Sequence, residues 1–296
     1  MGVAEVTISL YGPLVDVATL ADAIDDPLLR VVDCRWYLGK PGEGRVAYEA
    51  GHVPGALHLD IDTDLTARTG PGRHPLPDPD VFRRRLEEIG IGDEHAVVAY
   101  DDVGGWVAAR LWWMLDDLGH RSVAVLDGGI GAWTAAGLPL TREEPAFVPA
   151  RLSLRGSWRR VVDREGVRGG LGSLRVLDAR AGARYRGEIE PIDAYPGHIP
   201  TAISAPTDGN LAADGRFLSP AELAARYRGL GADGSMGDVV VSCGSGVSAT
   251  HDALAMRIAG LPDARLYPGS YSDWTQQGWP VATGSDPGEP PGGPDG

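Results

Sequence analysis

The chain has 296 residues, of which 43% are hydrophobic, and carries a formal net charge of −14 at pH 7. This length suits one large domain or two ordinary ones, and the hydrophobic content is sufficient for a buried core. The acidic excess argues against electrostatic binding to nucleic acid or to anionic membranes, and no stretch approaches the roughly 18 apolar residues of a membrane span. Because the N-terminus also lacks the basic and apolar regions of a signal peptide, we expect a cytoplasmic globular protein.

Short apolar strands alternate with helical patterns along the chain. The first half predicts helices over 16–26, 77–90 and 106–120, a short helix around Trp133, and strands over 28–34, 95–102 and 122–129. In the second half, a strand over 237–243 runs into a helical pattern over 248–261. Alternation with short connections predicts an α/β fold, in which parallel sheets are flanked by helices.

Four sequence blocks occur twice, in the same order. VVDCRW at Val31 recurs as VLDARA at Val176, and GHVPGA at Gly51 recurs as GHIPTA at Gly197. The segments VVAYDDVGG and DGGIGAWTAAGLPL likewise match VVVSCGSGV and PGSYSDWTQQGWPV, and all four offsets lie between 141 and 146 residues. A near-constant offset indicates a duplicated domain.

The duplication predicts four parts of the chain. An N-terminal copy over 1–142 and a C-terminal copy over 158–283 are joined by a linker over 143–157, where the hydrophobic pattern loses its periodicity. Residues 284–296 are acidic and rich in glycine and proline, a composition that predicts a disordered tail.

One of the two cysteines stands where chemistry is expected. Cys243 directly follows the apolar strand and opens the loop CGSGVSA, whose small residues allow backbone N–H groups to face the sulfur. A cysteine nucleophile attacks as the thiolate, and clustered N–H dipoles favour negative charge. The first copy has Asp101 at this position, so only the second copy can carry cysteine chemistry. Cys34 lies within a strand and is predicted to pack in the core.

The tandem arrangement, the GHxPxA blocks and the CGSGVSA loop resemble the two-domain sulfurtransferases of the rhodanese superfamily. The resemblance implies two rhodanese-like domains, each a parallel sheet flanked by helices, with a non-catalytic first copy and a catalytic second copy. It implies a sulfurtransferase that moves a sulfane sulfur from a small anionic donor, thiosulfate or 3-mercaptopyruvate, through a Cys243 persulfide to cyanide, a thiol or a thioredoxin-like acceptor. It implies neither a metal nor an organic cofactor.

The same resemblance assigns roles to further residues. The loop that cradles the sulfur comprises Gly244, Ser245, Gly246, Val247 and Ser248. Arg184 holds the donor, and its planar fork suits a carboxylate or a thiosulfonate group. Ser245, His74 and Asp62 correspond to a Ser-His-Asp relay, in which a histidine held by a carboxylate polarises the serine hydroxyl as the donor's C–S bond breaks.

The preferred donor and the mode of action stay open at this point. The CGSGV loop resembles that of the mercaptopyruvate enzymes, but Ile192 stands where those enzymes have a second arginine. The alternative to an enzyme is a persulfide carrier or regulatory module with little turnover, because a carrier needs the same cysteine. A phosphatase is disfavoured, since Ala249 stands where the loop of phosphatases with this fold needs an arginine to clamp phosphate.

Overall fold

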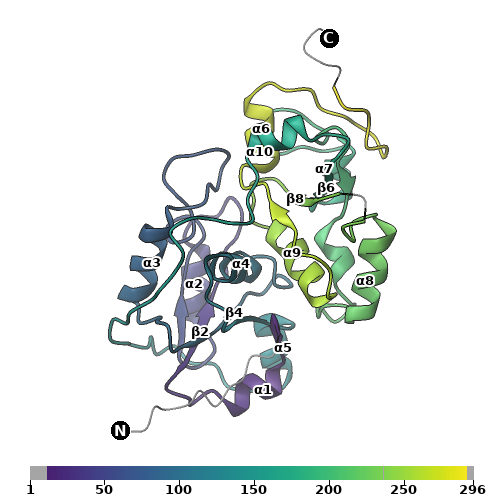
Figure 1. Ribbon diagram of the computed structural model, residues 1–296. Helices are drawn as coiled ribbons and strands as arrows, with labels where there is room; N and C mark the ends of the chain where they lie inside the picture. Colours follow the sequence, from purple (N-terminus) through teal and green to yellow (C-terminus); the bar gives the residue numbers. More distant parts are fainter. Residues whose placement is uncertain (1–11, 236, 292–296) are drawn as a thin grey trace. The chain divides into compact units, whose positions relative to one another are not determined.

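The computed structural model describes residues 12–235 and 237–291, which divide into two compact units (Figure 1). The first unit comprises the described part of 1–66 with 77–159 and 213–217, and the second comprises 67–76, 160–212 and the described part of 218–296. The second unit therefore takes the segment 67–76 from the middle of the first sequence copy.

The first unit is built on a parallel sheet. Its described strands are β1 (Leu14–Val15), β2 (Leu29–Asp33), β3 (Ala56–His58), β4 (Ala96–Tyr100) and β5 (Val123–Leu126), in the order β1-β5-β4-β2-β3. Each neighbouring pair is parallel. Every residue of β2, β4 and β5 is buried, as expected for strands that are covered on both faces.

Helices cover both faces of this sheet. The helices are α1 (Val17–Asp22), α2 (Glu43–Ala50), α3 (Pro79–Glu88), α4 (Ala108–Leu118) and α5 (Gly129–Ala135). On one face, Val31 and Val98 pack with Leu20 of α1 and Trp133 of α5. On the other side of β4, α4 packs against β4 and β5 (Figure 1).

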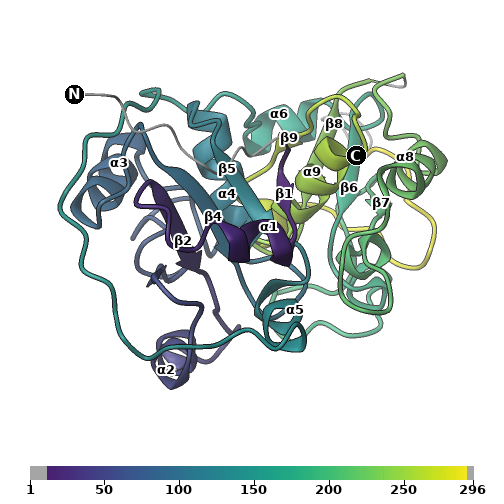
Figure 2. The same ribbon diagram turned by 90° about the horizontal axis from the view of Figure 1, so that it is seen from below.

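The second unit repeats this design with shorter strands. Its described strands are β6 (Arg175–Asp178), β7 (Ile203–Ser204), β8 (Val239–Ser242) and β9 (Arg265–Leu266), in the parallel order β7-β6-β8-β9. Its helices are α6 (Arg164–Gly169), α7 (Gly182–Tyr185), the 3₁₀ helix η1 (Thr207–Asn210), α8 (Pro220–Gly229), α9 (Ala249–Ile258) and α10 (Ser270–Gln276). Val176 and Val240 pack with Trp274 of α10. Helix α9 contacts β8 and β9, and α8 packs against α9 (Figure 2).

The predicted fold class, two α/β domains with helix-flanked parallel sheets, is confirmed. Helix α3 begins where the sequence indicates, because the Asp78 side chain accepts hydrogen bonds from two N–H groups of the first turn and Pro79 fixes the first helical position. Helix α1 ends at Asp22, earlier than predicted, because the chain tightens there into turns: the Ala23 and Ile24 N–H groups donate to the carbonyls three residues back.

The same buried histidine–tyrosine contact occurs at the GHxP block of each copy. The His52 ring stacks on Tyr48 with centroids 3.8 Å apart, and its Nδ1 lies 2.8 Å from the Tyr48 carbonyl oxygen. In the second unit, His198 stacks on Tyr185 at 3.7 Å, with Nδ1 again 2.8 Å from the tyrosine carbonyl oxygen. The repeated histidine therefore joins each block to the helix before it.

Residues of the predicted linker and of the predicted tail form hydrogen bonds with the two units. In the linker, the Leu152 N–H donates to the Glu87 carboxylate at 2.9 Å within the first unit. In the tail, residues 292–296 lie outside the described residues, whereas the Pro287 carbonyl accepts a hydrogen bond of 2.6 Å from the Thr201 N–H in the second unit.

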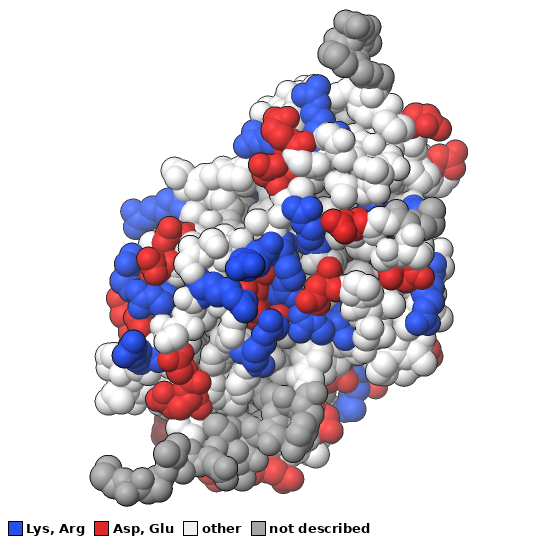
Figure 3. Space-filling model, viewed as in Figure 1, with Lys and Arg blue, Asp and Glu red and all other residues white. Residues whose placement is uncertain are grey.

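The helices and the surface charge bear on the expectations drawn from composition. Among residues 12–235 and 237–291, no helix combines the length and the apolar character that a bilayer crossing requires. The face drawn in Figure 3 carries basic as well as acidic side chains, so the net charge of −14 does not make that face uniformly acidic.

Asp101 fills the loop that follows β4. Its carboxylate is fully buried and accepts hydrogen bonds of 2.8 to 3.0 Å from the backbone N–H groups of Val103, Gly105, Val107 and Ala108. The carboxylate thus supplies, from within the chain, the negative charge that converging N–H dipoles favour.

Replacing Asp101 should destabilise the first unit. We expect Asp101→Ala to lower the free energy of unfolding by about 3 kcal/mol or more, because buried N–H groups lose their acceptors. The neighbouring exposed Asp102, which accepts a hydrogen bond from the Tyr37 hydroxyl, provides the control, and Asp102→Ala should cost less than about 1 kcal/mol. Urea unfolding measures both values, and equal losses would contradict this account of the Asp101 loop.

Candidate active site

Cys243 lies at the carboxyl end of β8, a central strand of the second sheet. β8 is flanked by β6 and β9, and α9 begins six residues after Cys243, at Ala249. Parallel α/β sheets bind ligands outside the carboxyl ends of their strands, because the loops there converge. The Cys243 residue is only 2% exposed.

Hydrogen bonds from the segment after β9 fix the backbone at Cys243. Its N–H donates to Ser270 Oγ at 3.1 Å, and its carbonyl oxygen accepts from the Tyr271 N–H at 3.0 Å. The Gly244 carbonyl accepts from the Ser272 N–H at 2.9 Å. Ser270 adopts a positive φ of 52°, a strained conformation for a residue with a side chain. These bonds hold the loop against the start of α10.

Gly246 brings a backbone donor to the sulfur. Its N–H donates to Cys243 Sγ at 3.1 Å. Its φ of 77° favours glycine, and a Cβ atom there would lie 2.3 Å from the Pro268 carbonyl oxygen. The loop can therefore turn back over the sulfur only with glycine at this position. An N–H group directed at Sγ favours the thiolate or persulfide anion.

His74 and Ser245 are brought together in the second unit. His74 Nδ1 lies 2.7 Å from Ser245 Oγ, and both residues are buried. His74 reaches the loop on the segment 67–76, where Gly72 approaches Gly269 closely: a Cβ atom on Gly72 would lie 2.4 Å from the Gly269 carbonyl oxygen. The pair can exchange a proton beside Cys243.

Asp62, the third residue of the expected relay, belongs to the first unit. There its carboxylate accepts a hydrogen bond of 2.8 Å from Trp36 Nε1. Its part in the relay stays a prediction.

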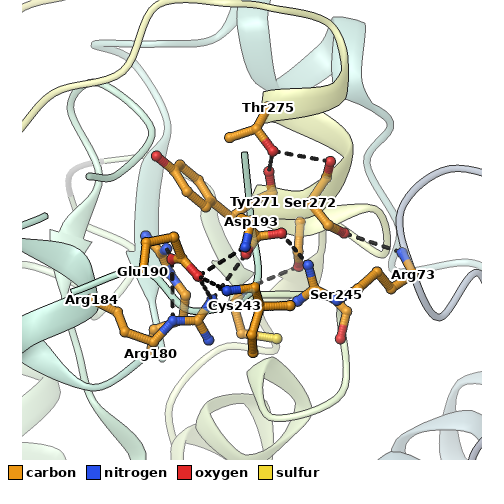
Figure 4. A network of polar contacts seen from close by, with 12 residues as sticks. Arg73, Arg180, Arg184, Glu190, Asp193, Cys243, Ser245, Tyr271, Ser272 and Thr275 are labelled. Atoms are coloured by element: carbon orange, nitrogen blue, oxygen red, sulfur yellow. Dashed lines mark hydrogen bonds and ion pairs between the residues drawn. The ribbon is translucent and has the colours of Figure 1, made fainter. Parts of the chain in front are cut away.

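Arg184 lies beside the loop and is held by two carboxylates. Its Nη2 is 2.7 Å from Glu190 and 3.0 Å from Asp193, and its Nε donates to Glu190 at 3.2 Å. Figure 4 shows these groups next to Cys243. Although burial opposes it, the hydrogen bonds from Arg184 and from nearby backbone N–H groups lower the pKa of Glu190. Glu190 is therefore a charged anchor for Arg184.

Arg180 links this cluster to the sheet. It donates through Nε and Nη2 to Asp178, at 3.0 and 2.6 Å, and its Nη1 lies 3.3 Å from Glu190. Its guanidinium carbon lies 3.9 Å from the centre of the Tyr271 ring, a cation–π contact. Arg35 forms the same bonds to Asp33 in the first unit, so Arg180 is a structural residue of the fold.

Three charged residues at the loop received no role from the sequence: Arg73, Glu190 and Asp193. Arg73 forms an ion pair with Asp193, which also contacts Arg184 (Figure 4). The available signal for Arg73 was its place directly before His74. Nothing in the sequence indicated that the segment 67–76 belongs with the second unit.

Cys34 is a core residue, as predicted. It is fully buried in the first unit, and burial, with the Asp33 and Asp101 carboxylates adding to it, raises the pKa of its thiol well above the usual range. A neutral, inaccessible thiol is a poor nucleophile. Within residues 12–235 and 237–291, no group of three or more His, Cys, Asp or Glu side chains is arranged to hold a metal ion.

Comparison with known proteins gives consistent matches along the chain. The family model described as "Rhodanese-like domain" matches residues 16–136 and 165–277. A probable 3-mercaptopyruvate sulfurtransferase of Pseudomonas aeruginosa is 44% identical over 272 residues, which cover 90% of this chain and 96% of that protein.

Two further relatives extend the comparison. The thiosulfate sulfurtransferase of Rattus norvegicus is 35% identical and covers 92% of this chain and 94% of its own length. The crystal structure of the 3-mercaptopyruvate sulfotransferase SseA from Escherichia coli superimposes with a TM-score of 0.77 at 30% identity, over 88% of this chain and 99% of that one. The relatives differ in the donor that they are named for.

A buried polar network supports α9, the helix that follows the Cys243 loop. Asp252 is fully buried and accepts hydrogen bonds from Asn210 Nδ2 at 2.8 Å and from the Tyr227 hydroxyl at 3.1 Å. Its second carboxylate oxygen is buried without a hydrogen-bond partner among the described residues. Burial raises the pKa of Asp252 to about 7.

Stability should therefore fall with rising pH through the titration of Asp252. The folded state holds a proton that the unfolded state releases near pH 4, so the Asp252 contribution to stability is lost between about pH 4 and 7, at up to about 1.4 kcal/mol per pH unit. Asp252→Asn keeps an oxygen acceptor and removes the titration. Urea unfolding at pH 5, 6 and 7 should show a shallower loss of stability in this variant, and identical slopes would contradict the assignment.

Proposed function

The chain belongs to the family of proteins with rhodanese-like domains, and we propose that it is a sulfurtransferase working through a persulfide on Cys243. The observation that carries this proposal is the position of Cys243: its sulfur accepts the Gly246 N–H, and the same loop carries Ser245 in contact with His74. A nucleophile, an amide donor and a proton-transfer pair thus share one loop. This set of groups serves sulfur transfer.

The first half-reaction loads the enzyme. Arg184 binds the anionic end of the donor, and the Cys243 thiolate attacks the sulfane sulfur. A new S–S bond forms while the donor's own bond to that sulfur breaks, and its electron pair leaves with the rest of the donor. The Gly246 N–H stabilises the resulting persulfide.

The leaving group decides whether a proton is needed. When the donor is 3-mercaptopyruvate, its C–S bond breaks, the proton of its thiol stays on the transferred sulfur, and pyruvate leaves as an enolate, which must take up a proton at carbon. The Ser245–His74 pair, with 2.7 Å between Oγ and Nδ1, can deliver that proton. When the donor is thiosulfate, sulfite leaves as a stable anion and needs no proton. The pair therefore favours 3-mercaptopyruvate as the donor, with thiosulfate as the second candidate.

The second half-reaction unloads the enzyme. A thiol of a small molecule or of a thioredoxin-like protein, or cyanide, attacks the outer sulfur of the persulfide and releases the Cys243 thiolate. The cycle needs a reduced Cys243, and both cysteines are free thiols. A reducing compartment such as the cytoplasm preserves this state.

Replacing the nucleophile should abolish turnover. We expect Cys243→Ser to reduce steady-state thiocyanate formation from cyanide at least about 10³-fold, because a serine hydroxyl does not form a persulfide. Cys34→Ser is the matched control and should retain wild-type turnover, since Cys34 is buried in the first unit. Similar losses in the two variants would contradict the assignment of Cys243.

The same assay separates the enzyme from a persulfide carrier. An enzyme forms many equivalents of thiocyanate per chain at a constant rate, whereas a carrier stops after a single equivalent. Sustained turnover by the wild type supports the enzyme.

The Ser245–His74 pair should matter for one donor only. We expect His74→Ala and Ser245→Ala to lower kcat with 3-mercaptopyruvate about 10²-fold, because the enolate loses its proton source. With thiosulfate, the same variants should stay within about threefold of the wild type, since sulfite leaves without a proton. Parallel kinetics with both donors measure this, and equal losses with both donors would show that the pair has no proton-transfer role.

A further inference from the structure

We propose that Arg73 is a second donor-binding residue, which with Arg184 grips the anionic end of the sulfur donor beside Cys243. The inference rests on the proposed function, because it takes the bound anion to be a sulfur donor. In this chain Ile192 stands where the mercaptopyruvate enzymes have a second arginine, and the proposal assigns the role of that arginine to Arg73.

Arg73 and Arg184 converge on the residue that follows the nucleophile. A Cβ atom on Gly244 would lie 2.8 Å from Arg73 Nη2 and 3.5 Å from Arg184 Nη1. Glycine at 244 therefore leaves the space in which both guanidinium groups approach the loop. Gly244 directly follows Cys243, so an anionic group held there belongs to a donor that reacts with Cys243.

Both arginines keep donors for a ligand. Arg184 uses Nε and Nη2 for the two carboxylates, and its Nη1 has no hydrogen-bond partner among the described residues. Arg73 uses Nη1 for Asp193, while its Nε is buried without a partner in the described part of the chain. Two nitrogen atoms near Gly244 are therefore left to bind the oxygen atoms of a carboxylate or a thiosulfonate: Arg73 Nη2 and Arg184 Nη1.

The backbone positions Arg73 independently of any ligand. Its N–H donates to Ser272 Oγ at 3.2 Å, and Gly72 adopts a φ of 75° where a side chain would collide with the Gly269 carbonyl. Ser272 also donates its own N–H to Gly244. One residue of α10 thus fixes both the Cys243 loop and Arg73.

Asp193 makes two nearby guanidinium groups compatible. Its carboxylate contacts Arg73 with one oxygen and Arg184 with the other, and its side chain is only 2% exposed. The repulsion between the two cations is offset by the carboxylate between them. Ile192, by contrast, is 38% exposed. Ile192 supplies no charge, and the second cation near Gly244 is Arg73 of the segment 67–76.

Alkylation of Cys243 by two reagents tests this assignment. Iodoacetate carries a carboxylate and iodoacetamide does not, so the ratio of their rate constants reports the attraction of an anion at Cys243. We expect Arg73→Gln to lower that ratio about tenfold relative to the wild type, because one cation next to the Cys243 loop is removed. Arg68→Gln is the matched control, since Arg68 is exposed in the same segment, and it should leave the ratio unchanged.

The ratio distinguishes binding from a structural role. A loop that is only distorted by Arg73→Gln would slow or speed both reagents alike, and an unchanged ratio would overturn the proposal.

If Arg73→Gln does not fold, Arg73→Lys serves instead. Lysine retains the charge but lacks the planar fork, so the KM for 3-mercaptopyruvate should rise several-fold while kcat changes little. An unaltered KM in the lysine variant would equally overturn it.

The alkylation ratio, unlike the KM of the lysine variant, does not depend on sulfur transfer. A tenfold lower ratio in Arg73→Gln, together with a wild type that forms no persulfide, would contradict the proposed function and leave the anion-binding role of Arg73 intact. A wild type that forms the persulfide, with the same ratio in Arg73→Gln, would contradict only the role of Arg73.

Discussion

The site depends on the hydrogen bonds that hold the Cys243 loop against the start of α10. The Cys243 N–H, the Cys243 carbonyl and the Gly244 carbonyl are bonded to Ser270, Tyr271 and Ser272 in turn. These bonds fix the backbone on both sides of the sulfur, so that Gly246 can direct its N–H at Sγ. A nucleophile held in this way meets its amide donor without reorganisation, which is the condition for electrostatic stabilisation in a buried site. The positive φ of Ser270 is the local cost of this arrangement.

The first unit builds the same backbone scaffold and closes it. The Ile130 N–H donates to the Asp101 carbonyl at 3.0 Å, as the Tyr271 N–H donates to the Cys243 carbonyl in the second unit. The Asp101 carboxylate then occupies the loop with four backbone N–H groups around it. One scaffold therefore has two uses: an internal carboxylate saturates it in one unit, and a cysteine leaves its amide donor for a reacting sulfur in the other.

The main strands, the start of α3 and the position of Cys243 could be predicted from the sequence, because each has a local pattern or a counterpart in the repeat. Strands β4 and β8 are short runs of mainly apolar residues, and α3 carries its own cap at Asp78, so local pattern is enough to find them. The repeat located Cys243 by its contrast with Asp101. The cluster of Arg73, Glu190 and Asp193 could not be predicted, because it forms between segments that are far apart in the chain, and no local pattern tells which repeat a loop will join. The predicted Arg184 is present at the loop, but its carboxylate partners were not foreseen.

The most direct test of the central claim is the intact mass of the protein after treatment with 3-mercaptopyruvate, followed by mapping of the modified peptide. The account predicts a gain of one sulfur atom, located on the peptide that contains Cys243 and removed when cyanide is added. Added sulfur on Cys34 instead, or an unmodified chain that still turns over the donor, would contradict a Cys243 persulfide as the intermediate.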